Sequence, residues 1–301
     1  MSKDFDIVLE ARKNIGLSDY NRDKDLKYPP GLEVISDLKY GRNIPFNLLD
    51  ISYPSSKSLK EKLPVIVNIH GGGFIYGYKE AYKYYCAYLA LQGFKVININ
   101  YSLAPEKKFP TQLFEVNKVF DFIYKNRDKY GLDINNIFVI GDSAGAELAM
   151  HYLVIKSNPK FRALFNMEVN NLIKVKACAL NCGYYDTSRW ITKKTEDGFE
   201  GDVYIGKFRK YKLMPLLDAY NSINSSFPPT YLLSGYFDFL KENVIPMYKH
   251  LKERGVEVIY SIKEDEFNND IYQHDFQVNM NLDISKKIVI EQTNFFKEHI
   301  N

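Results

Sequence analysis

The sequence predicts an α/β protein with a mostly parallel central sheet flanked by helices. From about residue 41 onward, short β-branched runs alternate with segments of helical periodicity, a pattern typical of such sheets. Two of the apolar runs stop directly at glycine-rich turns. The chain has 301 residues, of which 46% are apolar, so it can bury a large core and is not disordered.

The first half of the chain contains three predicted strands. Residues 64–69 form an apolar run that stops at HGGG, and residues 94–99 form a second β-branched run. Apolar residues recur at helical spacing from residue 111 to about residue 123. A third strand, 136–140, leads straight into GDSAG and then into a helix that ends near residue 155.

The second half continues the alternation. Its predicted strands are 175–180, 230–233 and 256–262, and its predicted helices are 244–254 and 284–299. In sheets of this kind, ligands bind at the carboxyl ends of the strands. The polar motifs described below follow strand ends, so we expect them to meet at one edge of the sheet.

Two segments depart from the alternation. Residues 1 to about 40 are polar and helix-prone, and residues from about 186 to 226 are polar and aromatic without a clear period. We see no repeats, so residues 1–301 are interpreted as a single domain that includes these two segments.

Charge and cysteine content exclude several classes of function. The net charge is +3 and lacks a strongly basic field, which argues against a nucleic-acid partner. Cys86, Cys178 and Cys182 are too few for a disulfide framework and are expected to be small buried side chains; no metal site is predicted. The charged start is not a secretory signal, and no apolar run approaches the ~20 residues of a membrane span. We therefore expect a cytoplasmic protein without a membrane partner.

Gly141-Asp142-Ser143-Ala144-Gly145 marks a candidate nucleophile. A serine hydroxyl becomes nucleophilic when it is exposed, held rigidly and placed beside a base. A sharp strand-to-helix turn supplies the first two conditions, and flanking glycines remove the Cβ clashes that such a turn creates. The GxSxG pattern should arise by chance roughly 0.1 times in a chain of this length. Its position between a strand and a helix makes Ser143 the predicted nucleophile.

The glycine run at residues 71–73 is the predicted oxyanion site. Successive glycines allow backbone N–H groups to point into a cavity and bind the negative oxygen of a tetrahedral intermediate. We predict donors from Gly72, Gly73 and Ala144. The alternative, a phosphate-binding loop, lacks the GxxxxGK[ST] and GxGxxG patterns. His70 is expected to steady the loop.

The predicted general base is His274. The chain has five histidines: His70, His151, His250, His274 and His299. His274 lies in a polar loop between the last strand and the last helix, at the carboxyl edge of the sheet. His151 lies about two turns into the helix after Ser143 and should point away from it, while the remaining histidines belong to the glycine loop or to helical patterns.

The acid that orients His274 is predicted to be Asp238. In this type of site the chain order is serine, acid, histidine, and Asp238 follows a strand and the Ser234-Gly235 turn. Glu242 is the nearest rival but fits the first turn of the next helix. Three further acids are close to His274 in sequence but do not follow a strand: Asp275, Asp270 and Glu266.

Together these motifs resemble the hormone-sensitive-lipase-like bacterial esterases of the α/β-hydrolase fold. The matching segments are HGGGF at 70–74, YSLAPE at 101–106 (family YRLAPE), GDSAG at 141–145, DFL at 238–240 (family DPL) and HDF at 274–276 (family HGF). The chain departs from the family pattern at Ser102 (usually Arg), Phe239 (usually Pro), Asp275 (usually Gly) and Ala146 (often Gly).

The resemblance implies a carboxylesterase that acts on short-chain acyl esters, acetyl-like ones included, and uses no cofactor. It also implies a helical cap formed by residues 1 to about 40 and about 186–226. A homodimer is compatible with the resemblance, since the family often pairs through an edge strand, but no sequence feature indicates one. The lining of the substrate pocket is not predicted; Tyr184, Tyr185, Trp190 and the aromatics at 74–78 fit either the pocket or the core.

Two other functions use the same residues. An amidase, formamidase or peptidase would need the same Ser-His-Asp machinery, and the sequence does not separate these leaving groups. A non-catalytic receptor with a capped pocket is the third alternative; receptors of this family lack the catalytic histidine, whereas His274 is present here.

Overall fold

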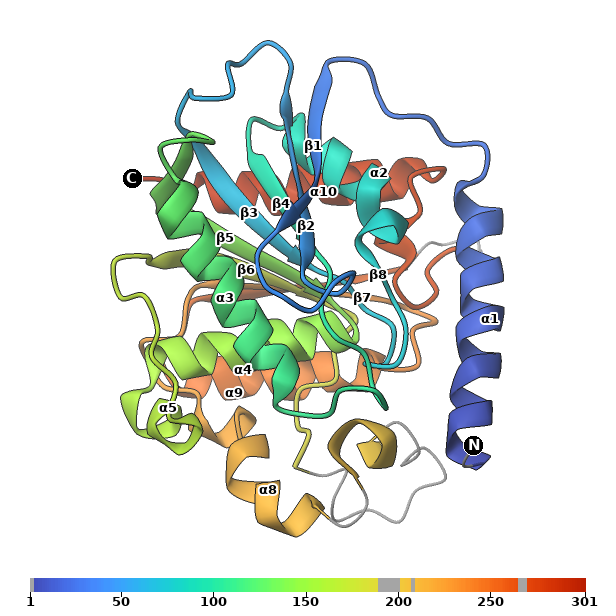
Figure 1. Cartoon of the computed structure of the whole chain (residues 1–301), viewed down its shortest axis with the longest axis vertical. Helices are drawn as coiled ribbons and strands as arrows, with labels where there is room; N and C mark the ends of the chain where they lie inside the picture. The colour runs from blue at the N-terminus through green and yellow to red at the C-terminus, as the bar shows by residue number, and fades with distance from the viewer. Residues whose placement is uncertain (1–2, 189–200, 207–208, 265–269) are drawn as a thin grey trace.

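A single twisted sheet forms the centre of the molecule (Figure 1). The computed structural model describes residues 3–188, 201–206, 209–264 and 270–301. In that part of the chain the sheet has eight strands in the order β1-β2-β4-β3-β5-β6-β7-β8. Their bounds are Leu32–Lys39, Leu48–Pro54, Leu63–Ile69, Lys95–Ile99, Leu132–Asp142, Val175–Asn181, Thr230–Gly235 and Val258–Lys263 for β1 to β8. Strand β2 is antiparallel to β1 and β4, and the other neighbours are parallel, so the predicted α/β fold is confirmed.

Helices cover both faces of the sheet (Figure 1). Helices α3, α4 and α9 pack on one face, and α2 and α10 on the other. The helices described are α1 Lys3–Asp23, α2 Lys83–Ala90, α3 Thr111–Asn126, α4 Ala144–Ser157, α5 Pro159–Phe165, α8 Lys210–Leu217, α9 Val244–Glu253 and α10 Asp283–Lys297.

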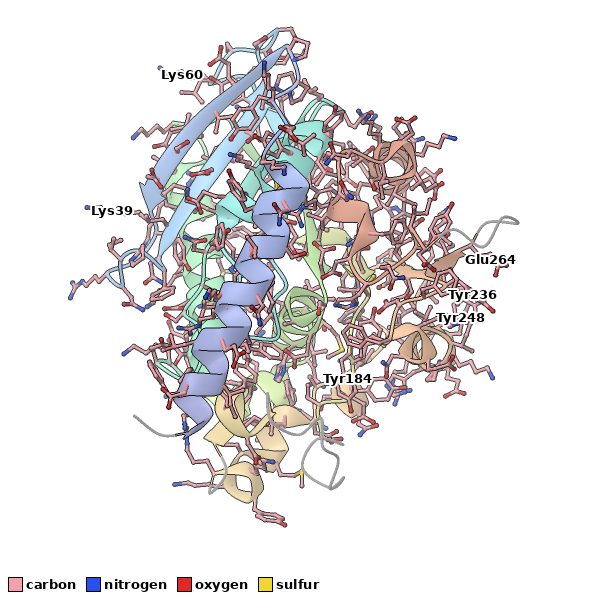
Figure 2. All side chains as sticks on the ribbon, turned by 90° about the vertical axis from the view of Figure 1, so that its right-hand side faces the viewer. Lys39, Lys60, Tyr184, Tyr236, Tyr248 and Glu264 are labelled. Atoms are coloured by element: carbon pink, nitrogen blue, oxygen red, sulfur yellow. The ribbon has the colours of Figure 1, made fainter. Side chains whose placement is uncertain are left out.

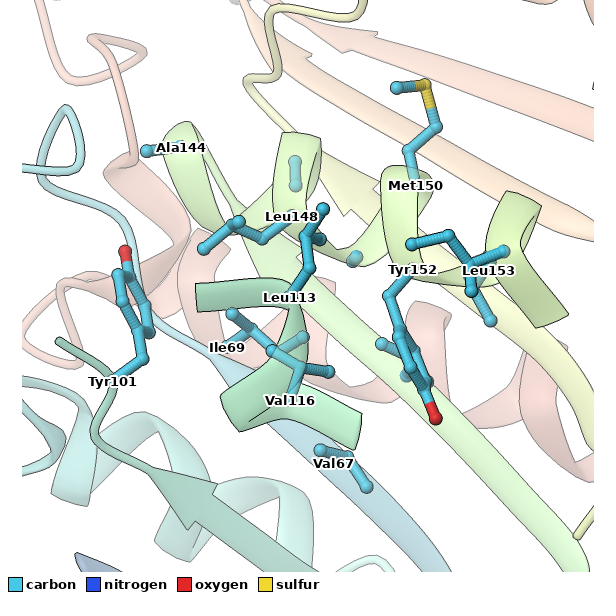
Figure 3. Packing of buried hydrophobic residues seen from close by; sticks show 14 of the residues in the cluster. Val67, Ile69, Tyr101, Leu113, Val116, Ala144, Leu148, Met150, Tyr152 and Leu153 are labelled. Atoms are coloured by element: carbon cyan, nitrogen blue, oxygen red, sulfur yellow. The ribbon is translucent and has the colours of Figure 1, made fainter. Parts of the chain in front are cut away.

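The alternation of side chains along β3 shows how the core forms. Val67 and Ile69 face the helices α3 and α4, whereas Ile66 faces the layer of α2 and α10, because successive strand residues point to opposite faces. Figure 3 shows Ile69 at a level between Leu113 and Val116 of α3, with Val67 below them, and all four belong to one buried cluster. Burial of each such side chain contributes about 1.5–3 kcal/mol. The central strands are therefore held rigidly, and so are the loops that follow them.

The first two strands of the sheet, β1 and β2, were not predicted from the sequence. The sequence predicts a helix-prone segment over residues 1 to about 40, broken at Pro29-Pro30-Gly31; α1 lies before that break, but the residues after it form the edge strand β1. Its side chains are mostly half-buried or exposed, and Asp37 adopts a positive φ where the register with β2 shifts. An edge strand with one solvated face and an irregular register gives little hydrophobic pattern, so the sequence signal was weak.

Helix α1 lies across the outside of the molecule (Figure 2) and is fixed there by polar contacts. Arg12 donates to both carboxylate oxygens of Glu106 at 2.7 Å and also to the carbonyl oxygens of Ile75 and Ala104. Tyr76 donates to Asp19 on the same helix. The helix is therefore tied to the loop that follows the glycine run. Within the described ranges, no helix has the length and apolar character needed to cross a bilayer.

Candidate active site

Ser143 occupies a strained turn between β5 and α4. Its φ of 53° and ψ of −117° lie outside the ordinary regions for a residue with a side chain, and its N–H donates to the carbonyl of Asn181 at 2.8 Å. The flanking glycines make this turn possible: a Cβ on Gly141 would lie 2.2 Å from the carbonyl oxygen of Gly145, and a Cβ on Gly145 would lie 2.1 Å from that of Ile69. The turn holds the hydroxyl of Ser143 at the carboxyl edge of the sheet, as predicted.

Replacing Gly145 with alanine is therefore expected to destabilise the protein strongly. The new methyl group would overlap the buried backbone of β3, which cannot move without disrupting the sheet, and the cost should be roughly 3 kcal/mol or more. Gly93→Ala is the matched control, because its φ is +98° but nothing lies within 4 Å of the added Cβ; backbone strain alone should cost ~1–2 kcal/mol. Urea unfolding of both variants measures the difference, and equal losses would contradict the steric argument.

The three predicted triad residues form one chain of hydrogen-bond contacts. His274 Nε2 lies 2.9 Å from Ser143 Oγ, and His274 Nδ1 lies 2.7 Å from Asp238 Oδ1. Asp238 follows β7 and is 4% exposed. Its Oδ2 accepts from the Ser234 hydroxyl at 2.6 Å, and its Oδ1 also accepts from the backbone N–H of Leu240 at 2.9 Å. The carboxylate is thus held on both oxygens and cannot turn away from the imidazole.

The electrostatics of His274 favour its protonated form. Burial by itself lowers the pKa of His274, but the charge of Asp275 and the hydrogen bond and charge of Asp238 outweigh burial and raise the pKa to about 9. For Asp238, burial raises the pKa, but the hydrogen bond from His274 and its charge lower it below the ordinary value. The imidazole is therefore a strong base, but it must first lose its own Nε2 proton before it can accept one from Ser143.

The glycine loop presents backbone donors beside Ser143. Gly72 and Gly73 have φ values of +109° and +59°, which L side chains rarely adopt. In the part of the chain that the structure describes, neither glycine donates its N–H to a protein acceptor. Ala144 is the first residue of α4, where an α-helix leaves its N–H groups without internal partners. The N–H groups of Gly72 and Gly73, two of the three residues predicted for the oxyanion site, are therefore available as donors.

His70 lies beneath this loop and has a structural position. It is completely buried, its ring stacks on Tyr101 with centroids 4.1 Å apart, and its Nδ1 lies 2.8 Å from the carbonyl oxygen of Gly71. Burial lowers the pKa of His70 to about 4, so the ring is neutral. Gly77 packs against the ring, since a Cβ there would lie 2.3 Å from Nδ1.

The remaining histidines have partners elsewhere. His151 is buried between the Glu147 carboxylate and the carbonyl oxygen of Leu216. His250 contacts the carbonyl of Tyr220, and His299 that of Phe295. The choice of His274 among the five therefore agrees with the geometry.

One group of side chains in the described residues has the spacing of metal ligands. The ligand atoms of Cys182, Asp238 and His274 lie within 4.8 Å of one another. However, Asp238 and His274 are hydrogen-bonded to each other, and burial raises the pKa of the Cys182 thiol well above its ordinary value. A protonated thiol is a poor metal ligand. The arrangement favours the Asp–His pair over a metal centre.

Two residues at the site were not assigned a role from the sequence. Phe239 is 74% exposed, and its ring lies against the imidazole of His274 with centroids 4.3 Å apart. The Asp275 carboxylate lies 3.5 Å from His274 Nε2. Phe239 replaces the proline of the family pattern and Asp275 replaces the glycine. These two departures were the signal in the sequence that could have pointed to both residues. Glu266 and Trp190 lie outside the described residues.

The sheet order, the turn at Ser143 and the Ser–His–Asp contacts define a protein of the α/β-hydrolase class. A family model described as BD-FAE matches residues 49–247, about two thirds of the chain. The chain therefore belongs to the BD-FAE family, and the resemblance to hormone-sensitive-lipase-like esterases is confirmed.

Known relatives agree with this assignment. An α/β hydrolase of Acanthamoeba polyphaga mimivirus is 29% identical over 259 residues, which cover 82% of this chain and 70% of the relative. The versiconal hemiacetal acetate esterase of Dothistroma septosporum is 30% identical over 221 residues. The match covers 66% of this chain and 64% of that enzyme, so this chain spans slightly less than two thirds of the enzyme's length. Esterase B of Lactobacillus rhamnosis has the same fold, with a TM-score of 0.88, 22% identity and coverage of 98% of this chain and 94% of that one.

Proposed function

We propose that the protein is a carboxylesterase that hydrolyses short-chain acyl esters through Ser143, His274 and Asp238. The observation that carries the proposal is the continuous contact chain from Ser143 Oγ to His274 Nε2, 2.9 Å, and from His274 Nδ1 to Asp238 Oδ1, 2.7 Å. Separations of this size allow direct proton transfer between nucleophile and base. The relatives support an ester substrate, since one is named an acetate esterase.

In the proposed reaction, Ser143 Oγ attacks the ester carbonyl carbon while His274 Nε2 takes the hydroxyl proton. Asp238 fixes the tautomer in which Nδ1 carries its proton and stabilises the imidazolium. The N–H groups of Gly72, Gly73 and Ala144 bind the negative oxygen of the tetrahedral intermediate. His274 then protonates the departing alcohol, and an acyl-enzyme on Ser143 remains. Water repeats the sequence and releases the acid.

The position of α1 supports a role for the N-terminal segment as part of a cap. Arg12 connects α1 to the carbonyl of Ile75, next to the glycine run. On the other side of the loop, the ring of Tyr204, in the short helix Asp202–Gly206, stacks on Phe74 with centroids 3.9 Å apart. We infer that α1 and residues of the 186–226 segment cover the acyl side of the site. The cytoplasmic location remains a prediction from the sequence, and a homodimer is suggested only by the family resemblance.

Hydrolysis of p-nitrophenyl acetate, butyrate and octanoate by the purified protein tests the proposal. We expect the acetate and butyrate esters to give the highest kcat/KM and the octanoate a value at least about tenfold lower, since a capped pocket excludes long chains. p-Nitroacetanilide, which offers an amide in place of the acetate ester, tests the amidase alternative. Turnover of the anilide without turnover of any ester would replace the proposal with an amidase. No turnover together with no fluorophosphonate labelling of Ser143 would contradict both.

A further inference from the structure

Asp275 is a second carboxylate beside the imidazole of His274. Its Oδ2 lies 3.5 Å from Nε2, the nitrogen that faces Ser143, whereas Asp238 occupies the opposite nitrogen. Asp275 has a φ of 55°, a left-handed conformation that aspartate and asparagine tolerate better than most residues. The family pattern has glycine at this position, so the carboxylate is an addition made by this chain.

The surroundings hold the Asp275 carboxylate against the reacting groups. A Cβ on Gly71 would lie 3.2 Å from Asp275 Oδ2, so the side chain packs on the glycine loop. Behind it lies Asp142, which is completely buried and accepts on Oδ1 from Asn181 at 2.6 Å and from Gln277 at 2.8 Å. Within the described residues, Asp142 Oδ2 and Asp275 Oδ1 are buried without a hydrogen-bond partner.

The two acids do not ionise independently. Burial, and then the negative charge of Asp275, raise the pKa of Asp142 to about 8. Burial raises the pKa of Asp275 as well, while the charge of His274 lowers it, so the two carboxylates titrate as a coupled pair in which Asp275 is the member that faces His274.

We propose that Asp275 is a positioning residue for the general base: its carboxylate attracts the Nε2–H of protonated His274 and competes with Ser143 for that nitrogen. The inference rests on the proposed esterase function. In the protonated state, the Nε2 proton lies between Ser143 Oγ and Asp275 Oδ2, and the serine cannot transfer its own proton. When that proton leaves to solvent, Nε2 becomes a hydrogen-bond acceptor. The Asp275 carboxylate repels the lone pair of Nε2, so the Ser143 hydroxyl becomes the preferred partner of that nitrogen.

The consequence is a site that is most active at alkaline pH. Four other titratable groups face His274 and Asp275, and each comes from a different element. They are Asp238 after β7, Asp142 at the end of β5, Cys182 after β6 and Tyr82 in the helical turn before α2. With the pKa of His274 raised to about 9, the base is protonated below that pH and free above it. The kcat/KM should therefore fall about tenfold for each pH unit below 9.

The pH dependence of kcat/KM for p-nitrophenyl acetate in Asp275→Asn and Asp275→Gly tests this inference. Both residues accept a left-handed backbone, so both variants should fold. We expect the acidic limb of the kcat/KM profile to shift to lower pH by about one unit or more, because a negative charge close to the imidazole has been removed. The value of kcat/KM at pH 7, expressed as a fraction of the alkaline plateau of the same protein, should then be roughly tenfold higher in the variants than in the wild type. Asp270→Asn, an exposed acid on the same loop, is the control and should leave the limb in place.

A uniform loss of activity at every pH, or an unchanged limb in both variants, would overturn the inference. A titration of the His274 imidazole by NMR separates this result from a failure of the esterase proposal, because it needs no turnover. If the pKa of His274 falls in both variants while no ester is hydrolysed, the positioning role stands and the proposed function fails. If esters are hydrolysed and the pKa does not move, the positioning role fails alone.

Discussion

Ser143→Ala is expected to reduce kcat/KM for p-nitrophenyl acetate by about 10⁴- to 10⁶-fold, because the oxyanion donors and substrate binding would act without a nucleophile. The fold should be unaffected, since the Ser143 N–H, which donates to the carbonyl of Asn181, is retained. A stopped assay over hours, together with thermal unfolding, measures both effects.

Ser157→Ala is the matched control for this variant. Ser157 is at the end of the same helix, and its hydroxyl donates to the carbonyl of Leu153. It should retain wild-type turnover and fluorophosphonate labelling, while Ser143→Ala should lose both. Residual turnover of Ser143→Ala above about one hundredth of the wild-type value would exclude Ser143 as the nucleophile.

Asp238→Asn is expected to lower kcat by roughly 10³- to 10⁴-fold without unfolding the protein. The asparagine fits the same space, but its amide would donate to His274 Nδ1. The imidazole proton would then be on Nε2, which faces Ser143 and could no longer accept the serine proton. Steady-state kinetics at the pH optimum measure the loss, and circular dichroism checks the fold.

Glu242→Gln distinguishes Asp238 from its nearest rival in the sequence. Glu242 lies in the short helix Lys241–Asn243 and is exposed, whereas Asp238 is buried against His274. We expect Glu242→Gln to change kcat less than twofold. A large loss in this variant with near-normal activity in Asp238→Asn would transfer the role of the acid to Glu242.

The strongest predictions from the sequence came from local patterns. The turn at Ser143 could be predicted because the glycines, the preceding β-branched run and the following helix are contiguous, and sterics permit few alternatives there. Asp238 and His274 could be predicted because each follows a strand, and parallel strands end at one edge. The structure places these three residues in contact across separations of 36 and 131 positions.

Features at the margin of the sheet were harder to predict. Strand β1 is irregular and partly solvated, so its residues lack the period that identified β3 and β5. Likewise, α1 is mostly polar and buries Val8 in the core, and its attachment also depends on Arg12 reaching residues more than 60 positions away. A helix held by such contacts has no strong sequence signature.

The sequence by itself determined the class of fold and predicted the candidate nucleophile and its two partners, because these predictions follow from contiguous steric patterns and from the order of strand ends. Only the tertiary structure decided what surrounds the imidazole. Asp275 is adjacent to His274 in sequence, yet its contact with Nε2 occurs in a left-handed turn, and its pKa depends on burial and on Asp238, which is brought there by β7. The pKa of a buried group is a sum over neighbours from several elements, and no local pattern encodes that sum.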